Sequence, residues 1–198
     1  MYIRAIVAVG LAAGLTGFAQ PEKQASAQRV AVCLSPGPHL LLIQPAQASA
    51  DKILARAGVS VKWYAGFRPC PADCIRMAFT DDTPPDFMPE ALAFAQPFEG
   101  VHIRIFVDRV QKTVEPGRVH CVLAHVMVHE LGHILQGVNR HSPTGIMKAR
   151  WDKNDYADMV WRPLPFTATD IFLIQLGLKL REYHGGSPSA RLAAAREP

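Results

Sequence analysis

Five consecutive residues, His129-Glu130-Leu131-Gly132-His133, carry the side chains best suited to chemistry in this sequence. In a helix, residues four apart lie about one turn apart on the same side, so both imidazoles can point at one metal ion. Glu130 comes next in the helix and is placed to hold a water molecule beside the ion, not to bind the ion itself. Because zinc prefers imidazole ligands, the segment predicts a zinc site. The alternative is a chance motif whose histidines are ordinary core residues.

A third metal ligand is expected after this segment, because catalytic zinc usually has three protein ligands and one open position. His141 is the nearest imidazole, and Gly137 lets the chain turn with positive φ and bring His141 back to the metal. Two alternatives stay open. In one, His141 is an exposed loop residue; in the other, the third ligand is a downstream acid, namely Asp152, Asp155 or Asp158.

The segment from Arg118 to about Gln136 must hold the motif in place. It contains no proline and has apolar residues around most of a helical surface, which predicts a central, buried helix. His120 and His125 lie earlier in the same helix. We expect His120 at the surface and His125 in the core or beside the site, with neither binding metal.

Alternating and apolar runs predict the other elements. A capping box at Thr167 predicts a last helix, and Gly58 ends an earlier one. Three prolines and three aspartates make residues 81–89 a loop, and residues 137–164 read as irregular. The expected strands are Val30–Leu34, Leu40–Ile43 (joined to the first by a turn), Val59–Tyr64, Ile75–Thr80 and Val101–Val107, and the expected earlier helix is Ala46–Ala57.

The motif and the residues after it resemble the metzincin metallopeptidases, whose pattern is His-Glu-x-x-His-x-x-Gly-x-x-His followed by a methionine-bearing turn. His129, Glu130 and His133 match directly, and the segment from His141 to Met147 is similar to the third ligand and the Met-turn. The glycine falls one residue late and the third histidine two residues late, so Asn139 stands where the family has histidine. Only residues 129–147 carry specific motifs, although the order of elements is also similar to matrixin-type domains.

The resemblance implies an α+β fold, a small zincin or metzincin-like domain with a twisted mixed sheet, a long active-site helix and a C-terminal helix. It also implies that Met147 lies under the metal ligands as an apolar floor. The implied activity is a zinc-dependent peptidase in which Zn²⁺ is held by His129, His133 and His141 and Glu130 is the general base. The competing hypothesis is a zinc-stabilised binding module without activity.

The N-terminal residues are typical of a signal peptide. Ile6–Ala19 is apolar, follows Arg4 and leads into Ala25-Ser26-Ala27, a small-x-small cleavage pattern. The expected organisation is therefore a signal peptide at 1–27, a peptidase domain at 28–184 and a flexible tail at 185–198. The expected location is secreted or periplasmic, with no membrane insertion after cleavage.

The composition argues against a nucleic-acid partner. The net charge is +4, and no run of Lys and Arg is interleaved with aromatic residues, so we expect no nucleic acid. The expected partner is a peptide or protein substrate, and the expected oligomeric state is a monomer.

Four cysteines in an exported chain predict disulfides. Cys70 and Cys74 are close enough in sequence to close a small loop, which would leave Cys33 with Cys121. A zinc-binding role for Cys70 and Cys74 is the alternative.

Overall fold

The computed structural model describes residues 28–65, 69–96 and 101–185. The expected signal peptide and residues 186–198 of the expected tail lie outside this part of the chain, whereas Gly185 is the last residue of the final helix. No helix in the described ranges is long and apolar enough to cross a membrane.

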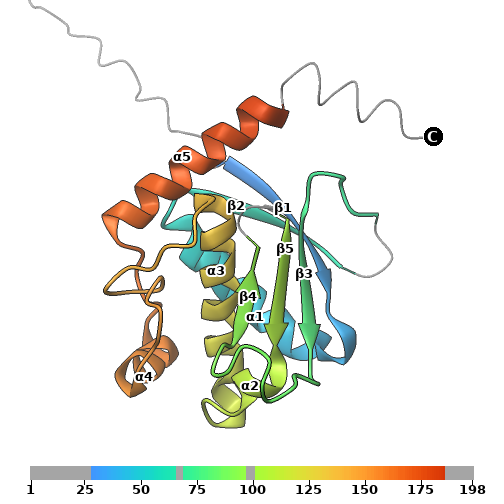
Figure 1. Ribbon diagram of the computed structural model, residues 1–198, viewed down its shortest axis with the longest axis vertical. Coiled ribbons are helices and arrows are strands. Elements are labelled where there is room, and N and C mark those ends of the chain that lie inside the picture. Colours follow the sequence, from blue (N-terminus) through green and yellow to red (C-terminus); the bar gives the residue numbers. More distant parts are fainter. Residues whose placement is uncertain (1–27, 66–68, 97–100, 186–198) are drawn as a thin grey trace, which may run out of the picture.

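A five-stranded mixed sheet, in the order β2-β1-β3-β5-β4, forms one layer of the molecule (Figure 1). Four strands are parallel and only β4, at one edge, runs antiparallel to its neighbour β5. The strands are β1 (Gln28–Ser35), β2 (Val59–Tyr64), β3 (Ile75–Thr80), β4 (Ala93–Ala95) and β5 (His102–Phe106).

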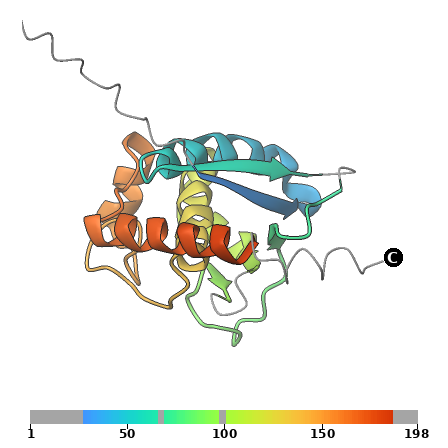
Figure 2. The same cartoon turned by 90° about the horizontal axis from the view of Figure 1, so that it is seen from above.

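Helices cover one face of the sheet and extend away from it. The helices α1 (Leu40–Ala55) and α3 (Val119–Gln136) pack against each other and against the sheet, and α5 (Ala168–Gly185) lies across the C-terminal end of α3 (Figures 1 and 2). The shorter helices are α2 (Val107–Gln111) and α4 (Lys153–Trp161), with single 3₁₀ turns at Gly37–His39 and Pro116–Arg118.

The position of α3 in the core explains why this helix is apolar on every side. Residues 122–136 of this helix are all buried, because α1 and the sheet cover one side while α4 and α5 cover the other. Close packing against α5 depends on Gly177, where a Cβ atom would lie 1.8 Å from the carbonyl oxygen of Leu135. The motif segment is therefore held rigidly in the centre of the molecule.

The expected α+β architecture is confirmed, and most predicted elements are present. The strands at 59–64 and 75–80, the buried helix and the helix after Thr167 lie where the sequence placed them. The prediction of a strand at Leu40–Ile43 was wrong, because these residues form the first turns of α1, with Pro45 early in the helix. Residues 137–164 are not wholly irregular, since α4 begins at a capping box formed by Asp152 and Asp155.

The predicted cysteine pairing was wrong. The structure bonds Cys33 to Cys70, with their Cα atoms 6.0 Å apart, and leaves Cys74 and Cys121 free. β1 lies between β2 and β3, so the connection from β2 to β3 must cross β1, and it brings Cys70 over Cys33. Cys121 lies on α3, on the opposite face of the sheet from Cys33, and cannot reach it.

Candidate metal and active site

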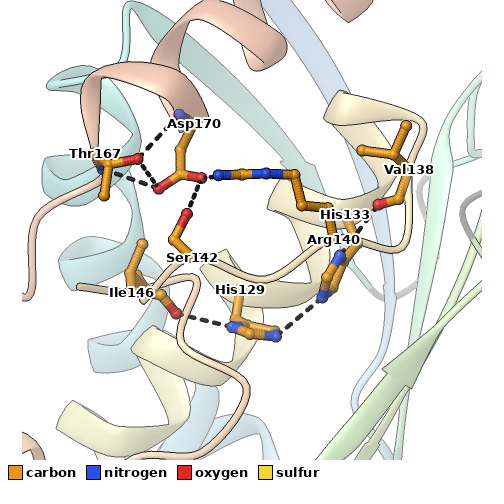
Figure 3. A network of polar contacts seen from close by, with 8 residues as sticks. All are labelled: His129, His133, Val138, Arg140, Ser142, Ile146, Thr167 and Asp170. Atoms are coloured by element: carbon orange, nitrogen blue, oxygen red, sulfur yellow. Dashed lines mark hydrogen bonds and ion pairs between the residues drawn. The ribbon is translucent and has the colours of Figure 1, made fainter. Parts of the chain in front are cut away.

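The histidines of the motif lie on one face of α3, with their ring nitrogens close together. Nδ1 of His129 lies 2.8 Å from the carbonyl oxygen of Ile146, and Nδ1 of His133 lies 3.3 Å from that of Val138 (Figure 3). A carbonyl oxygen only accepts hydrogen bonds, so Nδ1 carries the proton in both rings and each Nε2 presents a lone pair. The two Nε2 atoms are 3.0 Å apart. Two lone pairs that face each other at this distance repel, and a cation bound by both nitrogens would remove that repulsion.

His141 completes this group from a different part of the chain. Its ring centroid lies 4.9 Å from that of His133 and 5.4 Å from that of His129. One ligand nitrogen from each of the three rings lies within 4.8 Å of the others. Zinc–nitrogen bonds of about 2.0–2.1 Å place two tetrahedral ligand nitrogens roughly 3.3 Å apart. The donor set therefore fits a single zinc ion with one position left open.

The turn after α3 brings His141 back to the helix. Gly137 adopts the left-handed conformation (φ 68°), and its N–H donates to the carbonyl oxygen of His133, which ends the helix. The segment from Ser142 to Met147 closes on itself, because the Ser142 N–H donates to the Met147 carbonyl oxygen at 2.7 Å. Met147 is fully buried, and its sulfur would lie 2.6 Å from a Cβ atom at Gly132. It thus packs directly against the helix between His129 and His133.

Asp170 on α5 holds the segment that carries His141. Its fully buried carboxylate accepts hydrogen bonds from Arg140 Nη1 at 2.9 Å and Ser142 Oγ at 2.6 Å, which are the residues on either side of His141 (Figure 3). It also accepts from the Thr167 N–H and hydroxyl. Burial alone raises the pKa of Asp170, but the bonds from Ser142, Thr167 and Arg140 together lower it below the usual value. The sequence pointed to Asp170 only as part of a capping box.

The electrostatics of the site suit a bound cation. Burial is the main cause that lowers the pKa of all three imidazoles, and for His129 the value falls to about 3. The rings are therefore neutral at physiological pH and able to bind a metal. Burial also raises the pKa of Glu130 to about 8. A positive charge nearby is what this carboxyl group needs in order to ionise at neutral pH.

The alternative ligands from the sequence are engaged elsewhere. Asp152 and Asp155 cap α4 and form ion pairs with Lys148, and Asp158 pairs with Arg162. His125 is a core residue, whose Nε2 accepts from the Leu164 N–H and whose Nδ1 lies 2.7 Å from the Cys121 carbonyl oxygen. Two other residues of interest, His120 and Asn139, are not part of the histidine cluster, although Asn139 lines the nearby cleft.

A cleft of about 670 Å³ opens beside the three histidines. One wall is β4 with the loop before it, and the other is the segment from Lys148 to Trp151. The indole ring of Trp151 lies 5.5 Å from the ring of His129 and forms part of this wall. An exposed ion pair, Arg150 with Glu90 at 2.7 Å, joins the two walls.

The loop before β4 is held by one guanidinium group, which the sequence did not single out. Met88 and Glu90 in this loop have positive φ angles of 46° and 65°, which non-glycine residues rarely adopt. Arg109 of α2 donates to four carbonyl oxygens of the loop, those of Pro84, Phe87, Met88 and Ala91, at 2.6 to 3.0 Å. The strained wall of the cleft thus depends on Arg109.

The fold is similar to that of a solved structure, although the sequences differ widely. No protein-family model matches the sequence, and a search of curated proteins found no match. The structure is similar to archaemetzincin from Methanopyrus kandleri, with a TM-score of 0.55 and 15% identity over 79% of this chain and 98% of that one. Myroilysin matches with a TM-score of 0.36 and 12% identity over 73% of this chain and 71% of that one. The chain shares the archaemetzincin fold, and its histidine cluster is consistent with the motif His-Glu-x-x-His followed by a third histidine.

Proposed function

We propose that this protein is an exported zinc-dependent peptidase in which His129, His133 and His141 hold the metal and Glu130 is the general base. One observation carries the proposal. Three neutral imidazoles present their nitrogens to a common point beside a buried carboxyl group, at the edge of a cleft large enough for a peptide. Export rests on the signal-peptide pattern of residues 1–27.

Zinc at this site would lower the pKa of water toward about 7 and polarise the scissile carbonyl group. Glu130 lies on the same helix as two of the ligands and lines the cleft. Its carboxylate accepts a proton from the attacking water and donates it to the leaving amine. The main-chain bonds to His129 and His133 keep both rings in the tautomer that leaves Nε2 free for the metal.

β4 supplies the surface on which an extended substrate would lie. The Phe106 N–H donates to the Leu92 carbonyl oxygen and the Gln96 N–H to that of His102, so residues 92, 94 and 96 direct their backbone groups toward β5. Ala93 and Ala95, which alternate with them, direct theirs to the free edge of the sheet. This edge lines the cleft, so a peptide can add to the sheet as a further strand.

The test separates metal binding from catalysis. Glu130→Gln should keep zinc, measured by atomic emission after dialysis, and should lose at least about 100-fold in hydrolysis of a mixed peptide library. His141→Ala should lose both metal and activity, because it removes one of three protein ligands. Asn139→Ala should keep the metal, and His120→Ala serves as the control for loss of a histidine outside the cluster.

Two outcomes would overturn the assignment. If Asn139→Ala strips the metal and His141→Ala does not, the third ligand is assigned to the wrong residue. If the wild-type protein holds zinc firmly and cleaves no peptide in the library, the zinc-stabilised binding module replaces the peptidase.

A further inference from the structure

The face of the sheet away from the helices carries a second, smaller hollow. Side chains alternate along each strand, so the neighbours of buried Leu34, Met77 and Ile103 point to this open face. The hollow has a volume of about 260 Å³. The side chains of this face that line it include Ser35, Arg76, Ala78, Phe94, His102 and Arg104.

The strand register explains why a hollow forms here. Ser35 pairs with Ala78, Ala78 with Arg104, and Arg104 with Phe94, so these four residues form one row across β1, β3, β5 and β4. The two small side chains, Ser35 and Ala78, make the floor. Arg104 stands beside them, and Arg76 lies two residues before Ala78 on the same face.

The hollow is cationic. Arg76 and Arg104 are exposed, and in the described part of the chain neither guanidinium group has an ion pair or hydrogen bond. No strand residue on this face is acidic in the described ranges; its other members include Arg29, Ser60 and Lys62. Guanidinium groups bind carboxylates through paired, charge-assisted hydrogen bonds. The hollow therefore suits an anionic group, and in an unmodified peptide the anionic groups are carboxylates.

Phe94 connects this hollow to the cleft beside the histidines, because this residue lines both. A peptide strand added to the free edge of β4 would place the residue opposite Phe94 with its side chain on the open face. Neighbouring strands lie about 4.8 Å apart, so this residue is two strand spacings from Arg104. A glutamate side chain of the peptide and the side chain of Arg104, extended toward each other over Phe94, are together long enough to span these two strand spacings.

We propose that the open-face hollow is a specificity subsite that selects peptides with an acidic side chain, and that Arg104 and Arg76 recognise its carboxylate. This inference rests on the proposed peptidase function and names its substrate class. The acidic residue is the one that pairs with Phe94 when the peptide extends the sheet, or the next residue on the same face.

The test compares matched peptides that differ only by glutamate or glutamine, with the position scanned along the peptide. At one position, or at two positions two residues apart, the glutamate peptide should have a kcat/KM at least about tenfold higher, the size expected for one charge-assisted hydrogen bond. Arg104→Gln should bring this ratio close to one, and Arg76→Gln should reduce it. Arg104→Glu should reverse the preference in favour of lysine.

Arg29→Gln is the matched control, since it removes the same charge from the same face and does not line the hollow. It should leave the ratio unchanged. Binding of the same peptides to the Glu130→Gln variant, measured by fluorescence anisotropy, should show the same preference without turnover, and the preference should weaken with salt.

The two proposals fail in different ways. A protein that cleaves peptides with equal efficiency for glutamate and glutamine at every position keeps the peptidase function and overturns the acidic subsite. An unchanged ratio in Arg104→Gln, or an equal loss in Arg29→Gln, also overturns it. A protein that cleaves no peptide overturns the peptidase function first.

Discussion

Asp170 and Ser142 are joined by a hydrogen bond of 2.6 Å, although 28 residues separate them in the chain. Asp170 belongs to α5, which packs against α3, and Ser142 directly follows His141. The position of the third histidine is therefore determined by a helix that contributes no ligand. Groups that orient metal ligands in this way usually affect affinity strongly.

Asp170→Asn should weaken zinc binding by about 10- to 100-fold, the usual effect of removing such a partner. The amide keeps the size of the side chain, but it removes the charge that faces Arg140. Competition with a chromogenic chelator gives the affinity. Asp158→Asn, which alters an exposed ion pair with Arg162, is the control and should bind zinc normally. Equal affinities for all three proteins would show that α5 does not position His141.

The stability of the metal-free protein should depend on Glu130 between pH 6.5 and 8. Burial raises the pKa of this carboxyl group from 4.5 to about 8, so it stays protonated in the folded protein and is ionised when unfolded. Below pH 4.5 the carboxyl group is protonated in both states and does not oppose folding. As the pH rises toward 8, only the unfolded state can release the proton freely, so the free energy of unfolding falls. The wild-type protein should lose about 1.5 kcal/mol over this interval, and Glu130→Gln should lose much less. Urea unfolding at the two pH values measures the difference; equal losses would contradict the protonated state.

Arg109 should control the shape of the cleft wall without affecting the metal. Arg109→Lys replaces a planar group that donates to four carbonyl oxygens with an ammonium that cannot span them. We expect a higher KM for peptides, faster cleavage of residues 84–91 by an added protease, and unchanged zinc content. Lys112→Ala, which removes a mostly exposed cation from a nearby position, should change none of these. A normal KM in Arg109→Lys would mean that the loop keeps its shape without the guanidinium group.

The cysteines give a direct chemical check of the strand order. Peptide mapping without reduction should recover Cys33 linked to Cys70. Of the two free thiols, partly exposed Cys121 should react with a maleimide in the folded protein, whereas buried Cys74 should react only after denaturation. A Cys70–Cys74 link would mean that the connection between β2 and β3 does not cross β1 as described.

The sequence predicted the parts of the site that depend on local spacing. His129 and His133 lie four residues apart on one helix, so helical geometry alone brings their nitrogens together. The left-handed turn at Gly137 was also visible, because glycine after an apolar helix is a common way to end it. These features involve residues within one or two turns of each other.

The features that the sequence did not reveal depend on long-range packing. β4 has only three residues, two of them alanine, and becomes a strand because β5 provides its hydrogen-bond partners. The disulfide partner of Cys33 follows from the order of strands in the sheet, which spacing along the chain does not determine. The lack of a partner for Arg76 and Arg104 among the residues that the structure describes likewise depends on which residues the register places around them.

The packing of α5 on α3 also sets an order of events during synthesis of the protein. His129 and His133 leave the ribosome well before Asp170, so the loop that carries His141 lacks its buried carboxylate partner until α5 has been made and has packed at Gly177. Before that point the loop has only its contacts with α3 and its own internal bonds. If zinc binds here as proposed, a chain truncated before α5 should therefore bind it more weakly than the complete fold does.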